Sequence, residues 1–225
     1  METRCYPLLG EKAVEKYKKS HICIFGIGGV GGFVCEALAR CGIGEFTIVD
    51  MDIVNETNIN RQIIALNSTI NKKKVDVMKT RLLDINPNIK VNSYDIKVDS
   101  DTINQFDFSE FDYVVDCVDD VKAKLLIISK AKENNKMIIS SMGTGNKLDP
   151  SKFQIKDISK TEVCPLAKKV RLELRKKGIK GVKALFSTEE PIKSEDFVAS
   201  VSFVPSIAGL LIAREVILDL KSLNN

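Results

Sequence analysis

ICIFGIGGVGG, at residues 22–32, joins an apolar run to a glycine-rich turn. We expect ICIF (22–25) to form a short buried strand and FVCEALARCG (33–42) to continue as a helix. Gly26, Gly28 and Gly31 have the spacing of a dinucleotide fingerprint, in which glycines allow a tight turn, close approach to a phosphate and close packing of the helix. The helix N-terminus adds N–H donors and a positive dipole end. The stretch predicts a phosphate-binding unit but not which nucleotide it holds, and a close-packed turn without a ligand is the alternative.

Strand and helix patterns alternate from residue 22 to residue 141. Val75, Met78, Leu82 and Ile85, for example, form one helical stripe, whereas the strands are short apolar runs. Such alternation is typical of a parallel sheet covered on both faces, so the expected fold class is α/β: a Rossmann-like, doubly wound, mostly parallel sheet. The expected strands are 22–25, 45–50, 89–98, 112–118 and 136–141, and the expected helices are 33–42, 74–85 and 121–135.

The pattern changes beyond Gly145, where we expect a helix at 165–178, strands at 182–187 and 197–204, and a mostly buried helix at 206–222. From Lys147 to Lys183, twelve Lys and Arg stand against four acids, so this segment carries +8 in a chain of net charge +4. This concentration of charge suits a polyanionic partner. We predict one domain over residues 1–225, with a nucleotide-binding core at 1–145 and a substrate-facing part at 146–225 that holds a basic helical insertion and the C-terminal strands and helix.

The composition is that of an ordinary globular protein, with 225 residues, 44% of them hydrophobic and 28% charged. The first twenty residues lack the apolar core of a signal peptide, and the longest apolar stretch, near IAGLLIA (207–213), is too short to cross a bilayer. We therefore expect a cytoplasmic protein without a membrane span. The six cysteines include no CxxC pair and the chain has one histidine, so a structural zinc site is not expected.

The polar residues that follow the strands indicate which nucleotide the glycine-rich loop binds. Asp50 ends the second strand nineteen residues past Gly31, where it can accept hydrogen bonds from a ribose. An NAD or FAD enzyme is the first hypothesis, but it gives no purpose to the polar segment 51–62. Because the strands of a doubly wound sheet end at one edge, polar groups from separate segments can converge over the glycine loop. Two cations, a metal-type carboxylate and a ribose acceptor describe a triphosphate site with magnesium better than a pyrophosphate bridge. The converging residues are Asn58, Arg61, Gln62, Lys74, Asp116 and Asp119.

At these positions the chain resembles a known superfamily. GIGGVG, VDMD, TNINRQ, Lys74 before VDVM, INP and DCVDD are similar, in this order, to the ATP-binding domain of the ThiF, MoeB and HesA superfamily, which is related to the ubiquitin-activating enzymes. Members activate a carboxylate by joining it to AMP. The resemblance implies that Asp50 binds the ribose, that phosphates contact Asn58, Arg61 and Lys74, and that Asp119 holds magnesium. Arg4 matches an arginine that reaches the triphosphate, often across a dimer interface, whereas Asp120 stands where the family usually has Asn.

The resemblance thus implies ATP and Mg²⁺ as cofactors and a homodimer as the assembly. The implied catalytic residues are Arg4, Arg61, Lys74 and Asp119, with Asp119 also the metal ligand, and the implied nucleotide-binding residues are Gly26, Gly28, Gly29, Gly31, Asp50, Asp52, Asn58, Gln62 and Asp116.

A narrower resemblance extends over nearly the whole chain. HICIFGIGGVGGFVCEALARCGIGEFTIVDMD, TNINRQI, CPLAKKVRLELRKKGI and FSTEEP are similar to the tRNA threonylcarbamoyladenosine dehydratases. This implies that the threonyl carboxylate of a modified adenosine in tRNA is adenylated, after which the substrate's own nitrogen closes a ring and releases AMP. The basic helix would then bind tRNA, unless it is merely a solvated face. The expected RNA-binding residues are Lys168, Lys169, Arg171, Arg175, Lys176, Lys177, Lys180 and Lys183.

Three other functions stay open at this point. The nearest is an enzyme that activates the C-terminus of a ubiquitin-like sulfur carrier, although such enzymes normally carry two CxxC pairs that this chain lacks. A non-catalytic sulfur-relay module and an NAD oxidoreductase are further alternatives. A sulfur-transfer protein is a possible partner.

Overall fold

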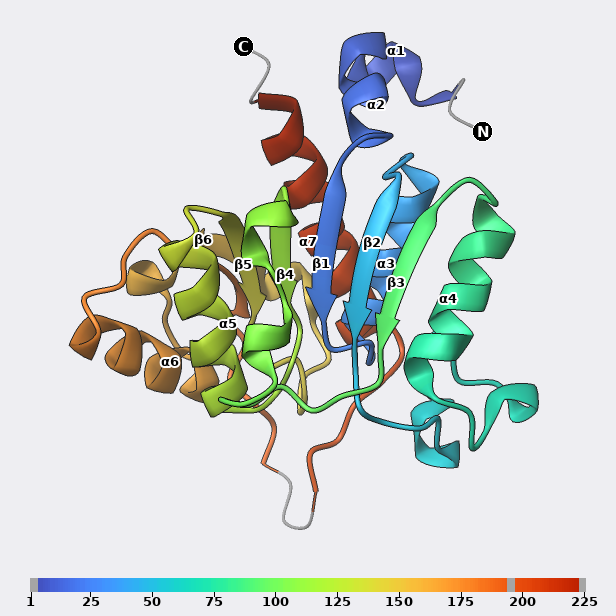
Figure 1. Cartoon of the computed structure of the whole chain (residues 1–225). Helices are drawn as coiled ribbons and strands as arrows, with labels where there is room; N and C mark the ends of the chain where they lie inside the picture. Colours follow the sequence, from blue (N-terminus) through green and yellow to red (C-terminus); the bar gives the residue numbers. More distant parts are fainter. Residues whose placement is uncertain (1–3, 194–196, 223–225) are drawn as a thin grey trace.

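The computed structural model describes residues 4–193 and 197–222 and contains one seven-stranded sheet with helices on both faces (Figure 1). The strands are β1 (His21–Phe25), β2 (Glu45–Val49), β3 (Lys90–Tyr94), β4 (Tyr113–Asp116), β5 (Met137–Ser141), β6 (Phe153–Asp157) and β7 (Lys183–Ser187). The α-helices are α1 (Tyr6–Leu9), α2 (Glu11–Tyr17), α3 (Gly31–Arg40), α4 (Lys74–Ile85), α5 (Val121–Glu133), α6 (Pro165–Lys176) and α7 (Phe203–Ser222).

The strand order is β3-β2-β1-β4-β5-β7-β6, and neighbouring strands are parallel except for β6 and β7. From β1 the chain moves to one side through α3, β2, α4 and β3, and it then returns to build β4, α5 and β5 on the other side. The connections therefore diverge between β1 and β4, which is the place where doubly wound sheets bind ligands. The predicted α/β, doubly wound, mostly parallel fold is confirmed.

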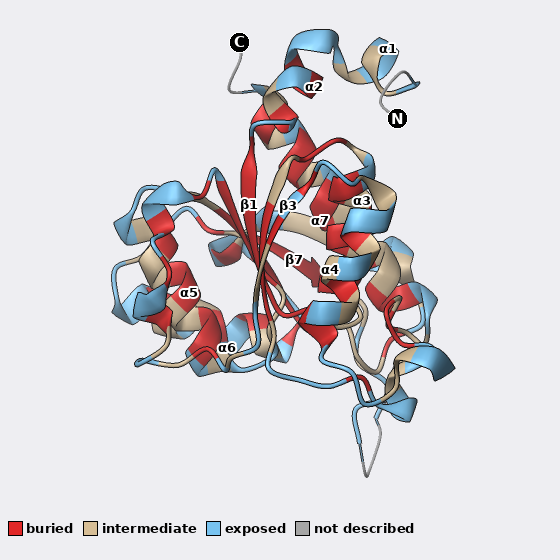
Figure 2. Ribbon diagram, turned by 45° about the vertical axis from the view of Figure 1, so that its right-hand side comes forward, coloured by how far each residue is buried: buried red, intermediate tan, exposed pale blue. Residues whose placement is uncertain are grey.

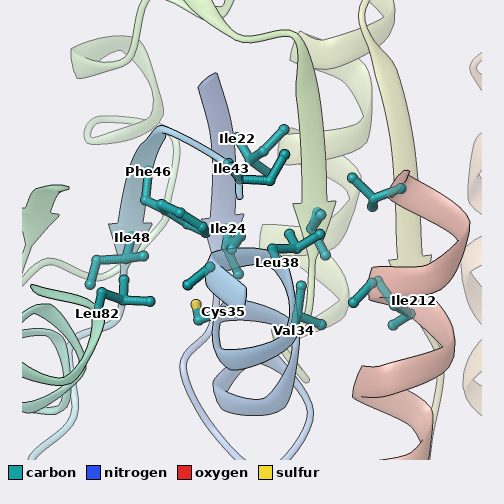
Figure 3. Packing of buried hydrophobic residues seen from close by; sticks show 14 of the residues in the cluster. Ile22, Ile24, Val34, Cys35, Leu38, Ile43, Phe46, Ile48, Leu82 and Ile212 are labelled. Atoms are coloured by element: carbon teal, nitrogen blue, oxygen red, sulfur yellow. The ribbon is translucent and has the colours of Figure 1, made fainter. Parts of the chain in front are cut away.

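The central strands of the sheet are buried on both faces, as the red ribbon of β1 in Figure 2 shows, whereas the edge strands β3 and β6 are only partly buried. In β1, Ile22 and Ile24 belong to the core beneath α3, α4 and α7, whereas Cys23 and Phe25 belong to the core beneath α5 and α6. This follows from the two-residue period of a strand. Figure 3 shows the first core, in which Ile24 lies beside Leu38 of α3, and Val34 of α3 lies toward Ile212 of α7. The continuous apolar run of β1 is therefore explained by a helix layer on each side.

The C-terminal helix α7 is fixed to both α3 and the sheet. A Cβ atom at Gly209 would collide with the carbonyl oxygen of Val30, so the missing side chain lets α7 pack closely on α3. Lys183 of β7 places its Nζ 2.6 Å from a carboxylate oxygen of Glu215 and 2.6 Å from one of Asp219, both on α7. Among the described residues, no helix combines the length and apolar character that crossing a membrane requires.

Three parts of the sequence prediction differ from the structure. Residues 197–204 are not a strand, because 197–201 have no regular structure and α7 already begins at Phe203. The apolar side chains of Phe197 and Val198, which suggested the strand, are 73% and 75% exposed. Conversely, strand β6 was not predicted, and it pairs antiparallel with β7 at the edge of the sheet. The third strand is also shorter than 89–98, because residues 95–98 leave the sheet after Tyr94.

Candidate active site

A pocket of about 550 Å³ lies at the carboxyl ends of the strands. Loops after β1, β2, β3, β4 and β5 form its walls, together with the segment that precedes α4 and the beginnings of α4, α6 and α7. The structure thus brings together residues from distant parts of the sequence. The predicted site residues that line the pocket are Gly26, Gly28, Gly29, Asp50, Asp52, Asn58, Arg61, Gln62, Lys74 and Asp119.

The glycines of the loop between β1 and α3 have different structural roles. Gly26 has φ = 86°, and a Cβ there would lie 2.8 Å from the backbone carbonyl of Cys117, so both conformation and space require glycine. A Cβ at Gly31 would collide with the Gly26 carbonyl oxygen, which explains why α3 can begin so close to β1. Gly31 does not line the pocket and acts through this packing. At Gly28 the nearest atom to a Cβ is Gln62 Nε2 at 3.7 Å, so the protein itself leaves room there.

Asp50 ties the end of β2 to the glycine loop. One carboxylate oxygen accepts a hydrogen bond from Ile27 N–H at 2.6 Å, and the other accepts one from Asp52 N–H at 2.9 Å. Burial raises the pKa of Asp50 above its ordinary value, although the charge of Lys74 partly opposes this effect. The carboxylate is thus oriented at the pocket wall, where it can accept a hydroxyl hydrogen bond.

Both predicted cations, Lys74 and Arg61, line the pocket, as does Lys97, which was not predicted. The Lys74 side chain is only 6% exposed, and its Nζ lies 2.7 Å from an Asp52 carboxylate oxygen. The Lys74 N–H also donates to the Asp52 carbonyl oxygen at 3.0 Å, so the first turn of α4 is held to the end of β2. Arg61 donates through Nη1 to the Thr57 carbonyl oxygen at 2.9 Å and to Asn60 Oδ1 at 2.8 Å. Both cations have fixed positions in which an anion can be bound.

Two amides accompany the cations. Asn58 Oδ1 accepts the N–H of Asn55 at 3.1 Å and thereby stabilises the short 3₁₀ helix Glu56–Asn58. Gln62 is 8% exposed, and its Oε1 is buried without a hydrogen-bond partner among the described residues. An unpaired buried polar atom is costly, so this pocket-lining amide fits a ligand that completes its hydrogen bonds.

Asp119 presents a free carboxylate to the pocket. It is exposed at the end of the β4 loop and forms no ion pair or hydrogen bond with the described residues. The adjacent Asp120 is the N-cap of α5, with its carboxylate accepting Ala123 N–H at 2.7 Å. No group of three or more acidic, Cys or His ligands occurs in the described chain. One free carboxylate fits Mg²⁺, because this ion is commonly held by one or two carboxylates together with substrate phosphates.

The predicted nucleotide contact of Asp116 does not agree with its placement. Asp116 is fully buried and is absent from the pocket lining. Its carboxylate pairs with Lys124 Nζ at 3.0 Å and accepts Ser140 Oγ at 2.5 Å and Val118 N–H at 3.1 Å. Asp116 therefore stabilises the loops that follow β4 and β5 from within the core and does not contact the pocket itself.

Sequence reasoning missed Lys124, which is also fully buried. Its spacing of three and four residues from Ile127 and Ile128 puts it on the apolar stripe of α5, and a lysine on such a stripe is the signal that could have revealed it. Sequence reasoning also missed the second half of the pocket lining, which includes Gly143–Gly145 and Leu166.

The basic helix α6 forms as predicted, although it ends at Lys176. Arg171 is only half-buried but donates to the carbonyl and hydroxyl oxygens of Thr161 at 2.5 and 2.6 Å, and Lys183 is paired with α7. Burial alone would lower the pKa of Lys183, but hydrogen bonds to Asp219 and Glu215 outweigh it and raise this pKa. Both residues have internal partners, so we remove them from the expected RNA-binding set. The exposed members are Lys168, Lys169, Arg175, Lys176, Lys177 and Lys180.

Arg4 is exposed and lies outside the pocket of its own chain. It precedes α1, which together with α2 lies at the amino end of β1, whereas the glycine loop is at the carboxyl end (Figure 1). Its contact with a nucleotide across a dimer interface stays a prediction.

Comparison with known proteins identifies the family. The ThiF family model matches residues 2–223. The chain belongs to the ThiF family. Within it, the chain is 42% identical over 231 aligned residues to the tRNA threonylcarbamoyladenosine dehydratase of Bacillus subtilis, an alignment that covers 94% of this chain and 91% of the relative. The relative of the same name from Escherichia coli is 40% identical over 190 residues, covering 81% of this chain and 71% of the relative.

Solved structures agree with this ThiF-family assignment. The crystal structure of the E. coli tRNA N6-threonylcarbamoyladenosine dehydratase, TcdA, in complex with ATP superposes with a TM-score of 0.91 and 35% sequence identity, covering 96% of this chain and 92% of that one. A complex of the same E. coli protein with AMP matches equally well.

Proposed function

We propose that this protein is an ATP-dependent tRNA threonylcarbamoyladenosine dehydratase. It would adenylate the threonyl carboxylate of threonylcarbamoyladenosine in tRNA and then close a ring with release of AMP. The observation that carries the proposal is the similarity, over 94% of the chain, to a dehydratase of this name. The structural relative that binds ATP supports the same nucleotide here.

The nucleotide half of the pocket supplies a partner for each part of ATP. In our proposal the Asp50 carboxylate binds the ribose, and the glycine loop accommodates the phosphates at Gly28, where space is free. Lys74 and Arg61 bind phosphate oxygens, with Asn58 and the unpaired Gln62 amide beside them. Asp52 keeps Lys74 in place through the 2.7 Å ion pair.

The free carboxylate of Asp119 is the proposed magnesium ligand, with phosphate oxygens completing the coordination. Bound Mg²⁺ would supply neutralisation of charge on the triphosphate.

The chemistry explains why cations predominate at the site. A carboxylate oxygen is a poor leaving group, so the threonyl carboxylate first attacks the α-phosphorus and expels pyrophosphate. Charge increases on the phosphoryl oxygens in this step, and Lys74 and Arg61 stabilise it from fixed positions. The attacking carboxylate is already ionised at pH 7, so no general base is needed. A nitrogen of the substrate then attacks the acyl-adenylate, and AMP leaves.

Docking of tRNA is proposed on the exposed basic face of α6, which consists of Lys168, Lys169, Arg175 and Lys176. Leu166, in the first turn of the same helix, lines the pocket. A nucleotide held by phosphate contacts with Lys168 and Lys169 would therefore be next to the pocket, whereas Arg175 and Lys176 would bind the tRNA roughly 10 Å further along the helix.

A homodimer is also proposed, with Arg4 of one chain reaching the ATP bound to the other. Apolar side chains exposed on the terminal elements support an interface there: Leu8 is 81% exposed, and Phe203, Leu210 and Leu218 lie on the outer face of α7. A cytoplasmic location agrees with a tRNA substrate, and a sulfur-transfer protein is retained as a further possible partner.

The test uses purified protein, ATP, magnesium and tRNA that carries threonylcarbamoyladenosine. We expect AMP and pyrophosphate to form together with a nucleoside that is one water lighter, as measured by mass spectrometry. Pyrophosphate exchange that depends on a small ubiquitin-like protein and not on modified tRNA would refute the proposal in favour of sulfur-carrier activation.

A further inference from the structure

The loop Gly143–Gly145 follows β5 and has backbone amides without partners. Met142 N–H donates to the Leu185 carbonyl oxygen at 2.8 Å, and Asn146 N–H donates to that of Ala199 at 2.7 Å. The three amides between them donate to no acceptor in the part of the chain that the structure describes, and all three residues line the pocket. Backbone N–H groups are nearly always paired with protein, water or a ligand, so this loop offers three consecutive donors. Backbone amides that lack a partner and line a pocket can donate to an anion that binds there.

The loop is anchored at both ends although its middle is unpaired. Before it, the buried Lys124 ammonium donates to the Ser141 carbonyl oxygen at 2.6 Å. After it, Asn146 Oδ1 accepts Ala199 N–H at 2.6 Å. A Cβ at Gly145 would collide with the Val198 side chain, so the loop packs closely against segment 197–200. Donors fixed in this way need little reorganisation when charge develops near them.

The strand order places the Gly143–Gly145 loop between the proposed ATP site and the proposed tRNA-binding helix. Along the carboxyl edge of the sheet, the end of β2 carries Asp50, the end of β1 carries the glycine loop, and the end of β4 leads to Asp119. The Gly143–Gly145 loop is next, at the end of β5, and beyond it α6 begins, with Cys164 Sγ 3.9 Å from the Cβ position of Gly143. The loop therefore lies between the proposed phosphate site and the proposed tRNA-binding helix.

We infer that the amides of Gly143, Thr144 and Gly145 bind the carboxyl group of the acceptor, an inference that rests on the proposed function. They hold the threonyl carboxylate before transfer and its remaining carbonyl oxygen afterwards. In ring closure the substrate nitrogen attacks the carboxyl carbon, and the carbonyl electron pair moves to oxygen. The resulting oxyanion is the group that the amides stabilise. When the carbonyl reforms, the bond to the AMP oxygen breaks, AMP leaves with the electron pair, and the nitrogen releases its proton to solvent.

The test exchanges single amides for esters. Each of Gly143, Thr144 and Gly145 is replaced in turn by the corresponding α-hydroxy acid, such as Gly145→glycolic acid, which removes the N–H and keeps the side chain. Gly181→glycolic acid is the matched control, because the Gly181 amide also lacks a partner among the described residues but lies outside the pocket. Since these amides have no hydrogen bond to lose, the esters are expected to unfold at the temperature of the control.

We expect at least one ester in the loop to lower the rate of formation of the cyclised nucleoside about 100-fold, the usual effect of losing one oxyanion donor. The KM for ATP should stay within about twofold, because no nucleotide contact is removed. Three loop esters that match the Gly181 control would overturn the inference, and so would a KM for ATP that rises in step with the loss of rate. If the unaltered protein forms no cyclised nucleoside, the proposed function itself fails.

Discussion

Removing the buried Lys124 ammonium is the most informative test of how the pocket is supported. Lys124 and Asp116 are both fully buried, and Lys124 Nζ is bonded to the Asp116 carboxylate, to Ser140 Oγ at 3.4 Å and to the Ser141 carbonyl oxygen. In Lys124→Met the Asp116 carboxylate stays buried without its cation. Breaking a buried ion pair by removing one partner costs about 3–5 kcal/mol, so we expect a loss of about 4 kcal/mol in the free energy of unfolding.

A second substitution should recover part of that loss. In Asp116→Asn/Lys124→Met no unpaired charge remains. The Asn oxygen can still accept from Val118 N–H, and the Asn NH₂ group, which replaces the other oxygen, can donate to Ser140 Oγ. The orphaned Ser141 carbonyl then accounts for most of the remaining cost, which is about 2 kcal/mol. The double variant is therefore expected to be more stable than Lys124→Met, the opposite of additive behaviour.

Urea unfolding at pH 7, followed by circular dichroism, measures all four corners of this cycle. Lys122→Met in the same helix is the control, because Lys122 is exposed and its loss should change stability by less than about 0.5 kcal/mol. A double variant whose destabilisation equals the sum of the two single ones would refute the reasoning, since it would mean that the two charges do not depend on each other.

Four further predictions concern the site and its surroundings. Gly31→Ala should lower the melting temperature strongly, because the new Cβ would collide with the Gly26 carbonyl oxygen. Gly28→Ala, whose Cβ meets no protein atom closely, should keep the parent's melting temperature but bind ATP more weakly; equal melting temperatures of the two variants would contradict this. Asp119→Asn should lower magnesium-dependent pyrophosphate exchange about 100-fold at unchanged stability, and full exchange activity would remove Asp119 from the metal site. Replacing Lys168, Lys169 and Arg175 by Ala should weaken tRNA binding and reduce the slope of log affinity against log salt concentration by about 2–3. Lys183→Ala should leave that slope unchanged, because Lys183 is paired with α7, and equal tRNA affinities for the two variants would refute a role of the basic helix. Burial alone would raise the pKa of Glu36, but hydrogen bonds from Arg81 and Arg40 lower it, so the Glu36 carboxylate stabilises the fold above its unfolded pKa of about 4.3 and this stabilisation is lost as the pH falls through the lower folded pKa. In urea unfolding, Glu36→Gln should therefore lose less stability than the parent on acidification, and parallel curves of stability against pH would contradict this.

The local part of the fold and of the site could be predicted from the sequence. Gly26, Gly28 and Gly31 follow an apolar strand and precede a helix, and these short-range features fix the turn that the structure contains. Asp50 was also predictable, because its place at the end of a parallel strand determines which edge it reaches.

The rest depended on partners far away in the sequence. From the sequence alone, Asp116 resembles a pocket carboxylate, but in the structure it pairs with Lys124 on the next helix. Lys183 likewise resembles a surface cation, but it pairs with Glu215 of α7. The segment 197–204 has the apolar alternation of a strand, but it pairs with none of the seven strands, and β6 lies beside β7 instead. Side-chain pairing and strand neighbours are tertiary properties, which a single sequence does not display.

The position of α7 has a consequence for the order in which the molecule becomes functional during synthesis. Pro205 lines the pocket and lies 3.2 Å from the Cβ position of Gly29, so the wall over the glycine loop comes from a helix that is synthesised after all seven strands. A nascent chain can pair its first five strands well before that moment, yet its nucleotide pocket stays open on one side. A chain that stops before α7 would thus contain all seven strands of the sheet but an incomplete nucleotide pocket.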